Sequence, residues 1–213
     1  MPEHHDGGGD EQVLDGQATE ALGDFPHEIA DQIRSFLVAV REVAAGESPE
    51  SAVPMLLLEV SQLLLAGGRL GAIRDIVPAE RFEPDPGRDV DVDGLRSSLA
   101  NLLEPIDEYA EVFDPYADPP EIVHTRLSDD LAGAAADLSH GLAHYSAGRV
   151  DEALWWWQFS YLSSWGPAVS SALRALASVV AHARLDAAEV VDPAVSQEDE
   201  LVADTLSTVH QLD

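Results

Sequence analysis

Two histidines and an aspartate stand at a spacing that suits a metal site. Asp137, His140 and His144 fall at positions i, i+3 and i+7, so a helix would carry all three on one face. Two histidines four residues apart can bind a divalent cation, with the aspartate one turn away as a further ligand. The competing interpretation is an ordinary polar face, because the chain has eight histidines and no HExxH motif. We expect no cofactor and keep a divalent metal on this face as the alternative.

The stretch DVDVDG, Asp89 to Gly94, offers a second set of oxygen ligands. Its acidic residues and its glycine match the first half of an EF-hand calcium loop. The position at which that loop needs a bidentate glutamate is Ala100, and no helix is predicted to enter the loop. The pattern therefore favours an acidic loop that leads into the N-terminus of a helix.

Four carboxylates and an arginine form a third candidate group. Asp129, Asp130, Asp137, Glu152 and Arg149 lie on two predicted helices and the turn between them. Paired carboxylates can act as general acid and general base. Salt-bridged helix ends have the same sequence pattern, so both interpretations stay open.

The composition excludes several chemistries. All 11 basic residues are arginine, and the chain has no cysteine. Without lysine there is no P-loop lysine and no Schiff base, and without cysteine there is no thiol nucleophile, disulfide or Cys-ligated zinc. The sequence also lacks a GxSxG motif, a glycine-rich phosphate loop and a basic–aromatic RNA-binding signature. The balance is against an enzyme.

The tryptophans are the most distinctive feature of the chain. All four lie within residues 155–165, and three of them are consecutive. On a helix, Trp157 and Trp165 share the face of Leu154 and Tyr161. Aromatic stripes of this kind are usually core, so we predict that both rings are buried.

Trp156 falls on the opposite side of the same helix and is predicted to be the most exposed of the four. An exposed tryptophan bordered by small residues suits an interaction hot spot, with Arg149 and Glu152 at the neighbouring turn as its polar rim. The alternative is a helix buried between two layers, in which packing explains all four rings. The small neighbours of Trp156 are Ser160, Ser163 and Ser164.

The surrounding spacing resembles one tetratricopeptide (TPR) unit. A small residue, an aromatic ring, a turn glycine, a close-packing alanine and a bulky ring follow in the order of that repeat. No second copy lies one period away, so we expect one TPR-like helical hairpin inside another fold. The matching residues are Gly141, Tyr145, Gly148, Ala153 and Trp157.

A second pattern covers the same stretch and is specific across residues 127–177. Its elements are Asp129-Asp130-Leu131, Gly141-Leu142, Tyr145, Gly148-Arg149, Glu152-Ala153-Leu154, Trp155, Trp157, Trp165-Gly166 and Ala172-Leu173-Arg174. This pattern resembles an uncharacterised actinobacterial family, the domain-of-unknown-function family 5063. A fainter resemblance extends from Phe36 to Phe113. The family has no assigned activity, so the resemblance implies no functional residues.

The elements that must position these residues are predicted to be helices throughout. Helical periodicity and capping signals begin near Asp24 and Ser48, near residue 95, at Ser128, near Val150 and after Gly166-Pro167. Gly46 is predicted to end the first helix and Gly67-Gly68 the second, with a helical continuation through RLGAI as the alternative. Residues 106–124 are predicted to be a short helix and irregular chain packed through Tyr109, Phe113 and Tyr116. No segment shows sustained strand alternation, so we expect an all-α fold, a bundle of about six helices.

The charge divides the chain into three parts. There are 40 acidic residues, and the two ends, residues 1–24 and 186–213, contain acids and no basic residue. We predict a disordered acidic tail over 1–24, a single α-helical domain over 25–186, and an acidic tail over 187–213 with at most one weak helix. A net charge of −29 opposes nucleic acid and anionic membranes as direct partners.

The function predicted from these observations is a soluble, cytoplasmic, non-enzymatic helical interaction or adaptor module with a protein partner. Residues 1–12 lack the basic and apolar regions of a signal peptide, and the unbroken apolar runs are much shorter than the ~18 residues of a membrane span. The alternative is a metal-dependent or carboxylate-based enzyme that uses the His140/His144 face.

Overall fold

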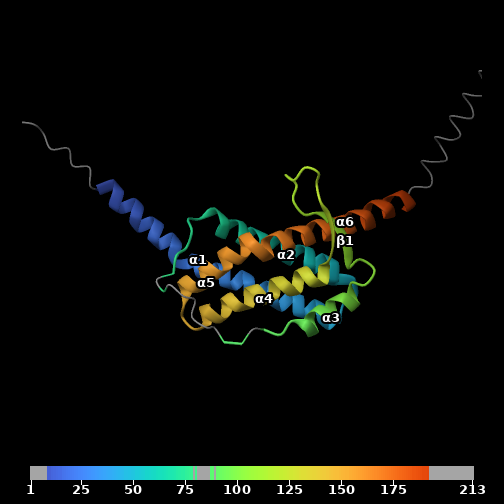
Figure 1. Ribbon diagram of the computed structural model, residues 1–213, viewed down its shortest axis with the longest axis horizontal. Coiled ribbons are helices and arrows are strands. Elements are labelled where there is room, and N and C mark those ends of the chain that lie inside the picture. The colour runs from blue at the N-terminus through green and yellow to red at the C-terminus, as the bar shows by residue number, and fades with distance from the viewer. Residues whose placement is uncertain (1–8, 79, 81–86, 89, 192–213) are drawn as a thin grey trace, which may run out of the picture.

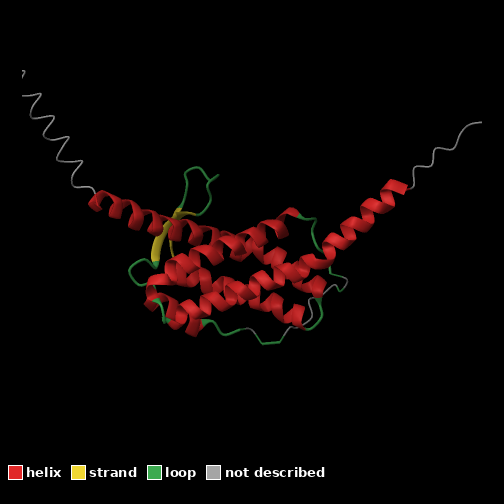
Figure 2. Cartoon of the chain, turned by 180° about the vertical axis from the view of Figure 1, so that it is seen from behind, coloured by secondary structure: helices red, strands yellow, loops and turns green. Residues whose placement is uncertain are grey.

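Helices make up most of the part of the chain that the structure describes, residues 9–78, 80, 87–88 and 90–191 of a computed structural model. The elements are α1 (Gly9–Ala45), α2 (Pro49–Ala72), α3 (Asp93–Leu102), β1 (Glu108–Val112), β2 (Ile122–Arg126), α4 (Leu127–Ser146), α5 (Val150–Ser160), the π-helical segment η1 (Tyr161–Trp165) and α6 (Gly166–Val191). They form a helical bundle with one β-hairpin against it (Figures 1 and 2). The helical class predicted from the sequence is confirmed.

The first helix begins earlier than the sequence predicted. α1 runs from Gly9 and contains Pro26, whereas the capping signals placed its start near Asp24. Its end agrees with the prediction, because Gly46 has a φ of 73°, which a glycine adopts without the Cβ clash of other residues. α1 and α6 extend from opposite ends of the bundle (Figure 1). The weak helix predicted near 198–210 and the tail over 192–213 lie outside the described residues.

α2 is a core helix because leucines occupy almost every side of it. Leu56, Val60, Leu63 and Leu70 are completely or almost completely buried against the neighbouring helices. By length and apolar composition alone α2 is also long enough to cross a membrane, which counting unbroken apolar runs had missed. The core helix of a bundle passes the same test, so this observation is weak evidence for a membrane span.

α2 does not end at Gly67-Gly68 but follows the alternative, a continuation through RLGAI, and ends at Ala72. A Cβ added at Gly67 would collide with the rings of Tyr161 and Trp165. Gly67 therefore allows the close approach of η1 to α2 and does not terminate the helix. The side-chain amide of Gln158 then holds the chain beyond α2, because it donates to the Leu70 carbonyl at 2.9 Å and accepts from the Ile76 amide at 2.9 Å.

The β-hairpin contradicts the all-α expectation for residues 106–124. β1 and β2 pair antiparallel, with Tyr109 opposite Thr125 and Glu111 opposite Val123. Each strand has only five residues, too short for its alternation to stand out from the surrounding sequence. The aromatic residues also differ from the prediction: Tyr109 is half-buried, whereas Phe113 and Tyr116 are exposed.

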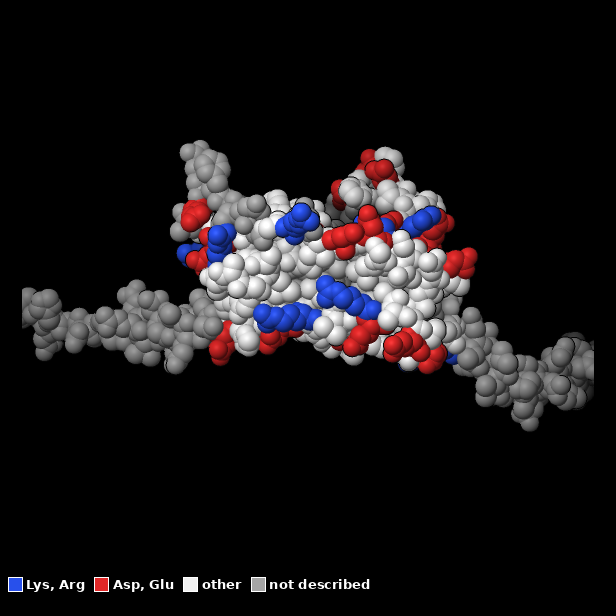
Figure 3. Space-filling view, turned by 90° about the horizontal axis from the view of Figure 1, so that it is seen from below, with Lys and Arg blue, Asp and Glu red and all other residues white. Residues whose placement is uncertain are grey.

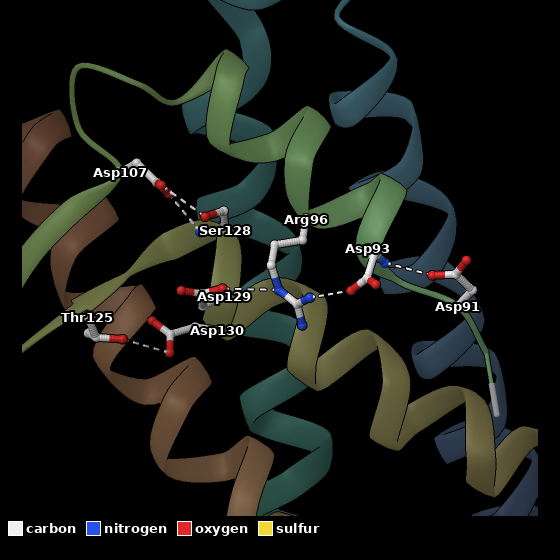
Figure 4. A network of polar contacts seen from close by, with 8 residues as sticks. All are labelled: Asp91, Asp93, Arg96, Asp107, Thr125, Ser128, Asp129 and Asp130. Carbon is white, nitrogen blue, oxygen red and sulfur yellow. Dashed lines mark hydrogen bonds and ion pairs between the residues drawn. The ribbon is translucent and has the colours of Figure 1, made fainter.

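The N-terminus of α4 is capped by a residue far away in the sequence. Ser128 was predicted as the cap, but it lies inside the helix and is buried. The Asp107 carboxylate accepts the Ser128 amide at 2.8 Å and its hydroxyl at 2.9 Å (Figure 4). The Leu127 amide donates to the Asp107 carbonyl at 2.9 Å. Asp107 thus satisfies helix amides that have no partner within the helix and joins β1 to α4.

The break predicted at Gly166-Pro167 is also wrong, because helical backbone continues from α5 through η1 into α6. Proline lacks the amide that would donate to the carbonyl one turn earlier, and a widened π-helical turn accommodates this loss without ending the helix. The same turn brings Tyr161 and Trp165 together against α2, with ring centroids 4.9 Å apart.

Candidate functional site

The tryptophan helix packs on α4 through a glycine. A Cβ on Gly141 would collide with the Trp157 indole, so only glycine leaves room for this ring. The indole N–H of Trp157 donates to the Leu138 carbonyl at 3.2 Å, and Tyr145 lies 5.9 Å from Trp157 between ring centroids. The turn between the two helices uses Gly148 at a φ of 78°. The residues chosen for the TPR comparison therefore do form a close helical hairpin, while its likeness to that repeat stays a prediction.

The four tryptophans divide into two pairs. Trp157 and Trp165 are 0% and 1% exposed, which confirms that they belong to the core. Trp155 and Trp156 are both half-buried. Trp156 is partly exposed, and its indole N–H donates to the Asp137 carbonyl of α4 at 2.8 Å, while its rank as the most exposed of the four stays a prediction. Packing against the core thus accounts for Trp157 and Trp165, and Trp156 also packs against the core with part of its surface.

Trp155 and Trp156 belong to a surface group of rings, here called the aromatic cluster, which consists of Trp155, Trp156, Phe159 and His140. Trp155 and Phe159 stack at 5.8 Å and 13°, and Trp156 lies 4.1 Å from His140 between ring centroids. Phe159 is 52% exposed. Trp156 and His140 also border a surface hollow of about 340 Å³ between α4 and the loop at Arg88. The cluster therefore continues from α5 across to α4.

The three predicted metal ligands lie on α4 but do not form a ligand set. His144 is 0% exposed, and the Asp137 carboxylate accepts the Ser164 hydroxyl at 2.6 Å. His140 packs on Trp156. Within the residues that the structure describes, no group of three or more His, Asp or Glu side chains is placed to hold a metal ion. The chemistry of this face is therefore aromatic contact and hydrogen bonding.

The carboxylates proposed as one cluster are separated in space. Asp129 and Asp130 lie in the first turn of α4, whereas Arg149 caps α5 beyond the other end of that helix and Glu152 follows in its first turn. α4 has 20 residues, which corresponds to ~30 Å between its ends. Arg149 is exposed and Glu152 is half-buried at the turn, and both precede the aromatic cluster on the same helix.

The acidic loop before α3 has a structural role. Arg96 pairs with Asp93 at 2.6 Å and with Asp129 at 3.0 Å, so it ties α3 to α4 (Figure 4). The Asp91 carboxylate accepts the amide of Asp93, the first residue of α3, at 3.0 Å. The described part of DVDVDG therefore leads into a helix N-terminus, as the sequence predicted. Asp89 lies outside the described residues.

Asp130 is the centre of a polar group that the sequence analysis missed. Its carboxylate accepts the Tyr109 hydroxyl at 2.7 Å and the Thr125 hydroxyl at 3.3 Å, so both strands are joined to α4. Burial raises the pKa of Asp130 to about 6. Burial and the hydrogen bond to Asp130 also raise the pKa of Tyr109 above its usual range. The hydroxyl residues Tyr109 and Thr125 were visible in the sequence. Nothing in the sequence indicated that they lie opposite each other on two paired strands.

A second hollow lies between the hairpin and α6. This hollow, the β1–α6 groove, has a volume of about 510 Å³ and is bordered by all of β1 and by one face of α6 that includes Ser170, Ser171, Arg174 and Ser178. Burial raises the pKa of Glu111 in the groove, although Arg174 opposes the shift. The groove was not predicted, because it depends on a strand that the sequence pattern did not reveal.

Charges of both signs are interspersed on the face shown in Figure 3. Large uncharged areas separate them, and the acidic residues do not form a single patch there. Arg69–Glu28 at 2.6 Å and Arg34–Asp31 at 2.8 Å are among the ion pairs of the described residues. The acidic excess of the chain is therefore not concentrated on this face.

Comparison with known proteins shows a family and a fold. The chain matches the family model described as a domain of unknown function, DUF5063, over residues 20–182. No curated protein matches. The crystal structure of protein BF1032 from Bacteroides fragilis is similar in fold, with a TM-score of 0.56, 19% identity, 71% of this chain covered and 89% of that chain covered. The match over residues 20–182 shows that this chain belongs to the DUF5063 family.

Proposed function

We propose that this protein is a non-enzymatic interaction module that binds a protein partner through the aromatic cluster. The observation that carries the proposal is the stacked pair of Trp155 and Phe159, with Phe159 52% exposed and Leu162, one turn further along, 61% exposed. Large apolar side chains that remain on the surface beside half-buried tryptophans are typical of interaction sites. Core packing uses Trp157, Trp165 and part of Trp156, but it leaves Phe159 exposed beside Trp155.

The partner that fits is a protein with an apolar centre surrounded by basic residues. The chain carries a net charge of −29 and no lysine, so a basic rim on the partner is attracted from a distance. Glu152 precedes Trp155 and Trp156 by one helical turn on α5 and supplies a negative group at the edge of the cluster. Arg149, at the same turn, adds a second polar contact. The TPR-like character of the hairpin, a cytoplasmic location and an actinobacterial source remain predictions from the sequence.

A substitution in the cluster tests this proposal. The full chain is used to capture partners from cell extract, and the affinity of the identified, purified partner is then measured for the wild type, Phe159→Ser and Leu185→Ser. We expect Phe159→Ser to weaken binding by about tenfold or more, the size of a hot-spot effect. Leu185→Ser is the matched control, since Leu185 is 67% exposed on α6 and outside the cluster. Rising salt should also weaken binding, because it screens the acidic surface.

The two variants also define the result that would contradict the proposal. If Phe159→Ser and Leu185→Ser bind every captured partner with equal affinity, the cluster is not the docking surface. Thermal melts of both variants show whether the fold is retained. Phe159 is half exposed, so its replacement should change the melting temperature little.

A further inference from the structure

The hydrogen-bond pattern of the hairpin shows which backbone groups of β1 point away from β2. The Leu127 amide donates to the Asp107 carbonyl, and the Phe113 amide donates to the Glu121 carbonyl. These two pairs continue the register in which Tyr109 lies opposite Thr125. Hydrogen-bonded and non-hydrogen-bonded pairs alternate along an antiparallel ladder. Tyr109 and Glu111 are therefore bonded to β2, and the amides and carbonyls of Glu108, Ala110 and Val112 point to the other edge.

That other edge has no strand beside it. Within the described residues, no backbone hydrogen bond joins Glu108, Ala110 or Val112 to a further segment. A strand edge of this kind is a template for pairing with another chain. Proteins commonly cover such an edge, and a binding site is one reason to leave it open.

The β1–α6 groove lies along this free edge. All five residues of β1 border it, although their side chains alternate between the two faces of the strand, and no residue of β2 borders it. A hollow that contacts both kinds of β1 residue and avoids β2 must lie beside the strand, on the side away from β2. α6 residues border the same groove, and Figures 1 and 2 show α6 crossing the hairpin.

The opposite wall of the groove leaves room for a backbone. It is a face of α6 made largely of small side chains, Ser170, Ser171, Ala175 and Ser178. Five residues of extended chain occupy ~17 Å, and a paired strand lies ~4.8 Å from its neighbour. The Ser170 hydroxyl donates to the Gly166 carbonyl at 2.7 Å, so its oxygen can still accept a hydrogen bond from an added strand.

The charges in the groove favour a basic side chain in the occupant. Glu111 is half-buried and faces the same side of β1 as Tyr109. Within the described residues its carboxylate forms no hydrogen bond or ion pair, and Arg174 acts on it only at longer range. A strand that covered Glu111 without supplying a cation would remove the carboxylate from water at a cost in free energy. A basic side chain placed opposite Glu111 offsets that cost.

We propose that the β1–α6 groove binds an extended peptide of a partner protein, which adds to β1 as an antiparallel strand and places an arginine or lysine against Glu111. The peptide donates to and accepts from the backbone of Glu108, Ala110 and Val112. This site is separate from the aromatic cluster and goes beyond the function proposed above.

Two other occupants fit the charges less well. A second copy of the chain also carries a net charge of −29, so edge-to-edge pairing of two copies brings like charges together. The C-terminal residues 192–213 of the chain itself contain acids and no arginine, so they offer no cation to Glu111. Pairing with a second copy remains an outcome of the test.

Selection from a displayed library of random nine-residue peptides tests the proposal on the full chain. The strongest binder is synthesised with a fluorescent label, and its Kd is measured by fluorescence anisotropy against the wild type, Ala110→Pro and Ala110→Ser. Proline removes the amide that points into the groove and leaves the bonds to β2 untouched, since edge strands tolerate proline. We expect about tenfold weaker binding to Ala110→Pro and less than about threefold change for Ala110→Ser, the range for loss of a backbone hydrogen bond.

The peptide provides a control that leaves the protein unchanged. N-methylation should weaken binding about tenfold at residues whose amides face β1 and much less at the alternate residues. The selected peptides should be enriched in arginine or lysine, and Glu111→Gln should weaken their binding. The absence of any selected binder, or equal binding to Ala110→Pro and the wild type, would overturn the proposal.

Two further outcomes would also overturn it. Peptide binding that Phe159→Ser abolishes and Ala110→Pro leaves intact would place the peptide on the aromatic cluster. Concentration-dependent dimerisation in sedimentation that Ala110→Pro removes would show that a second copy occupies the edge. A partner lost on Phe159→Ser, with peptide binding retained, would support both sites independently.

Discussion

Asp130 is the residue at which the hairpin and the bundle meet. Its carboxylate accepts hydroxyls from Tyr109 on β1 and Thr125 on β2, while its own backbone belongs to the first turn of α4. The helix dipole and both hydrogen bonds favour the ionised form, yet burial raises the pKa of Asp130 from 3.8 to about 6. Desolvation is therefore the largest effect on this carboxylate.

The raised pKa predicts the direction of a pH effect on stability. The folded state binds the Asp130 proton more tightly than the unfolded chain, so this contribution is fully present below the unfolded pKa of 3.8 and is lost as the pH rises through about 6. Asp130→Asn keeps one oxygen, which can accept the Tyr109 hydroxyl, but replaces the other with an amide and cannot ionise. As the pH rises from 3.8 to about 6, we expect the free energy of unfolding of the wild type to fall relative to that of Asp130→Asn. Urea unfolding at a series of pH values measures the difference.

The neighbouring carboxylate supplies the control. Asp129 is exposed and pairs with Arg96, so Asp129→Asn should not reproduce the same slope. Two results would contradict burial as the dominant cause. The curves of the wild type and Asp130→Asn could be parallel, or the wild type could become more stable than Asp130→Asn as the pH rises.

Among the elements, the contact between α4 and α5 depends most clearly on a single glycine. Trp157 occupies the space that a side chain on Gly141 would fill, and its indole donates to a carbonyl of α4. Gly133, on the same helix, has open space where a Cβ would be. Both glycines therefore have helical backbone, but Gly141 is tightly packed and Gly133 is not.

Replacing each glycine with alanine should change stability in opposite directions. Gly141→Ala should lower the free energy of unfolding by about 1–3 kcal/mol, because the new methyl group overlaps a fully buried indole. Gly133→Ala should raise it by about 0.5–1 kcal/mol, since alanine has the higher helix propensity. Thermal and urea unfolding of both variants measure the changes. Equal effects of the two substitutions would show that Gly141 is not a close-packing site.

At the scale of the whole molecule, the two most exposed aromatic residues lie outside the core. Phe113 and Tyr116 are 71% and 95% exposed in the connection between β1 and β2. Trp157 and Trp165 lie in the core cluster that joins α1, α2, α4 and α6. A protease should cleave at the exposed aromatic residues before the buried ones, because cleavage requires a segment that can unfold locally.

Limited digestion with chymotrypsin should therefore cut first at Phe113 or Tyr116. The peptide bonds between Val150 and Trp165 should remain intact at that stage, although this segment has more aromatic residues than the connection between β1 and β2. Mass spectrometry of the fragments over time identifies the order of cleavage. Early cuts within α5 or η1 would show that the tryptophan helix is not a stable part of the bundle.

The sequence by itself determined the helical class, the family and the core position of two tryptophans. These features depend on local periodicity and on motifs within short segments, such as Trp157 and Trp165 on the face of Leu154. Helical spacing places residues on a common face without knowledge of what that face contacts. The same limitation explains why the predicted surroundings of Trp156 were incomplete.

Only the tertiary structure decided the features that join distant segments. Asp107 caps α4, Gly67 admits the Tyr161 ring, and Asp130 accepts hydroxyls from both strands. In each case the sequence showed the residue type, but the partner lies in a distant segment that only the fold brings close. The β1–α6 groove likewise depends on β1, a strand of five residues. β1 is stable only when it pairs with β2 and packs on α4, because an isolated short hairpin is marginally stable in water.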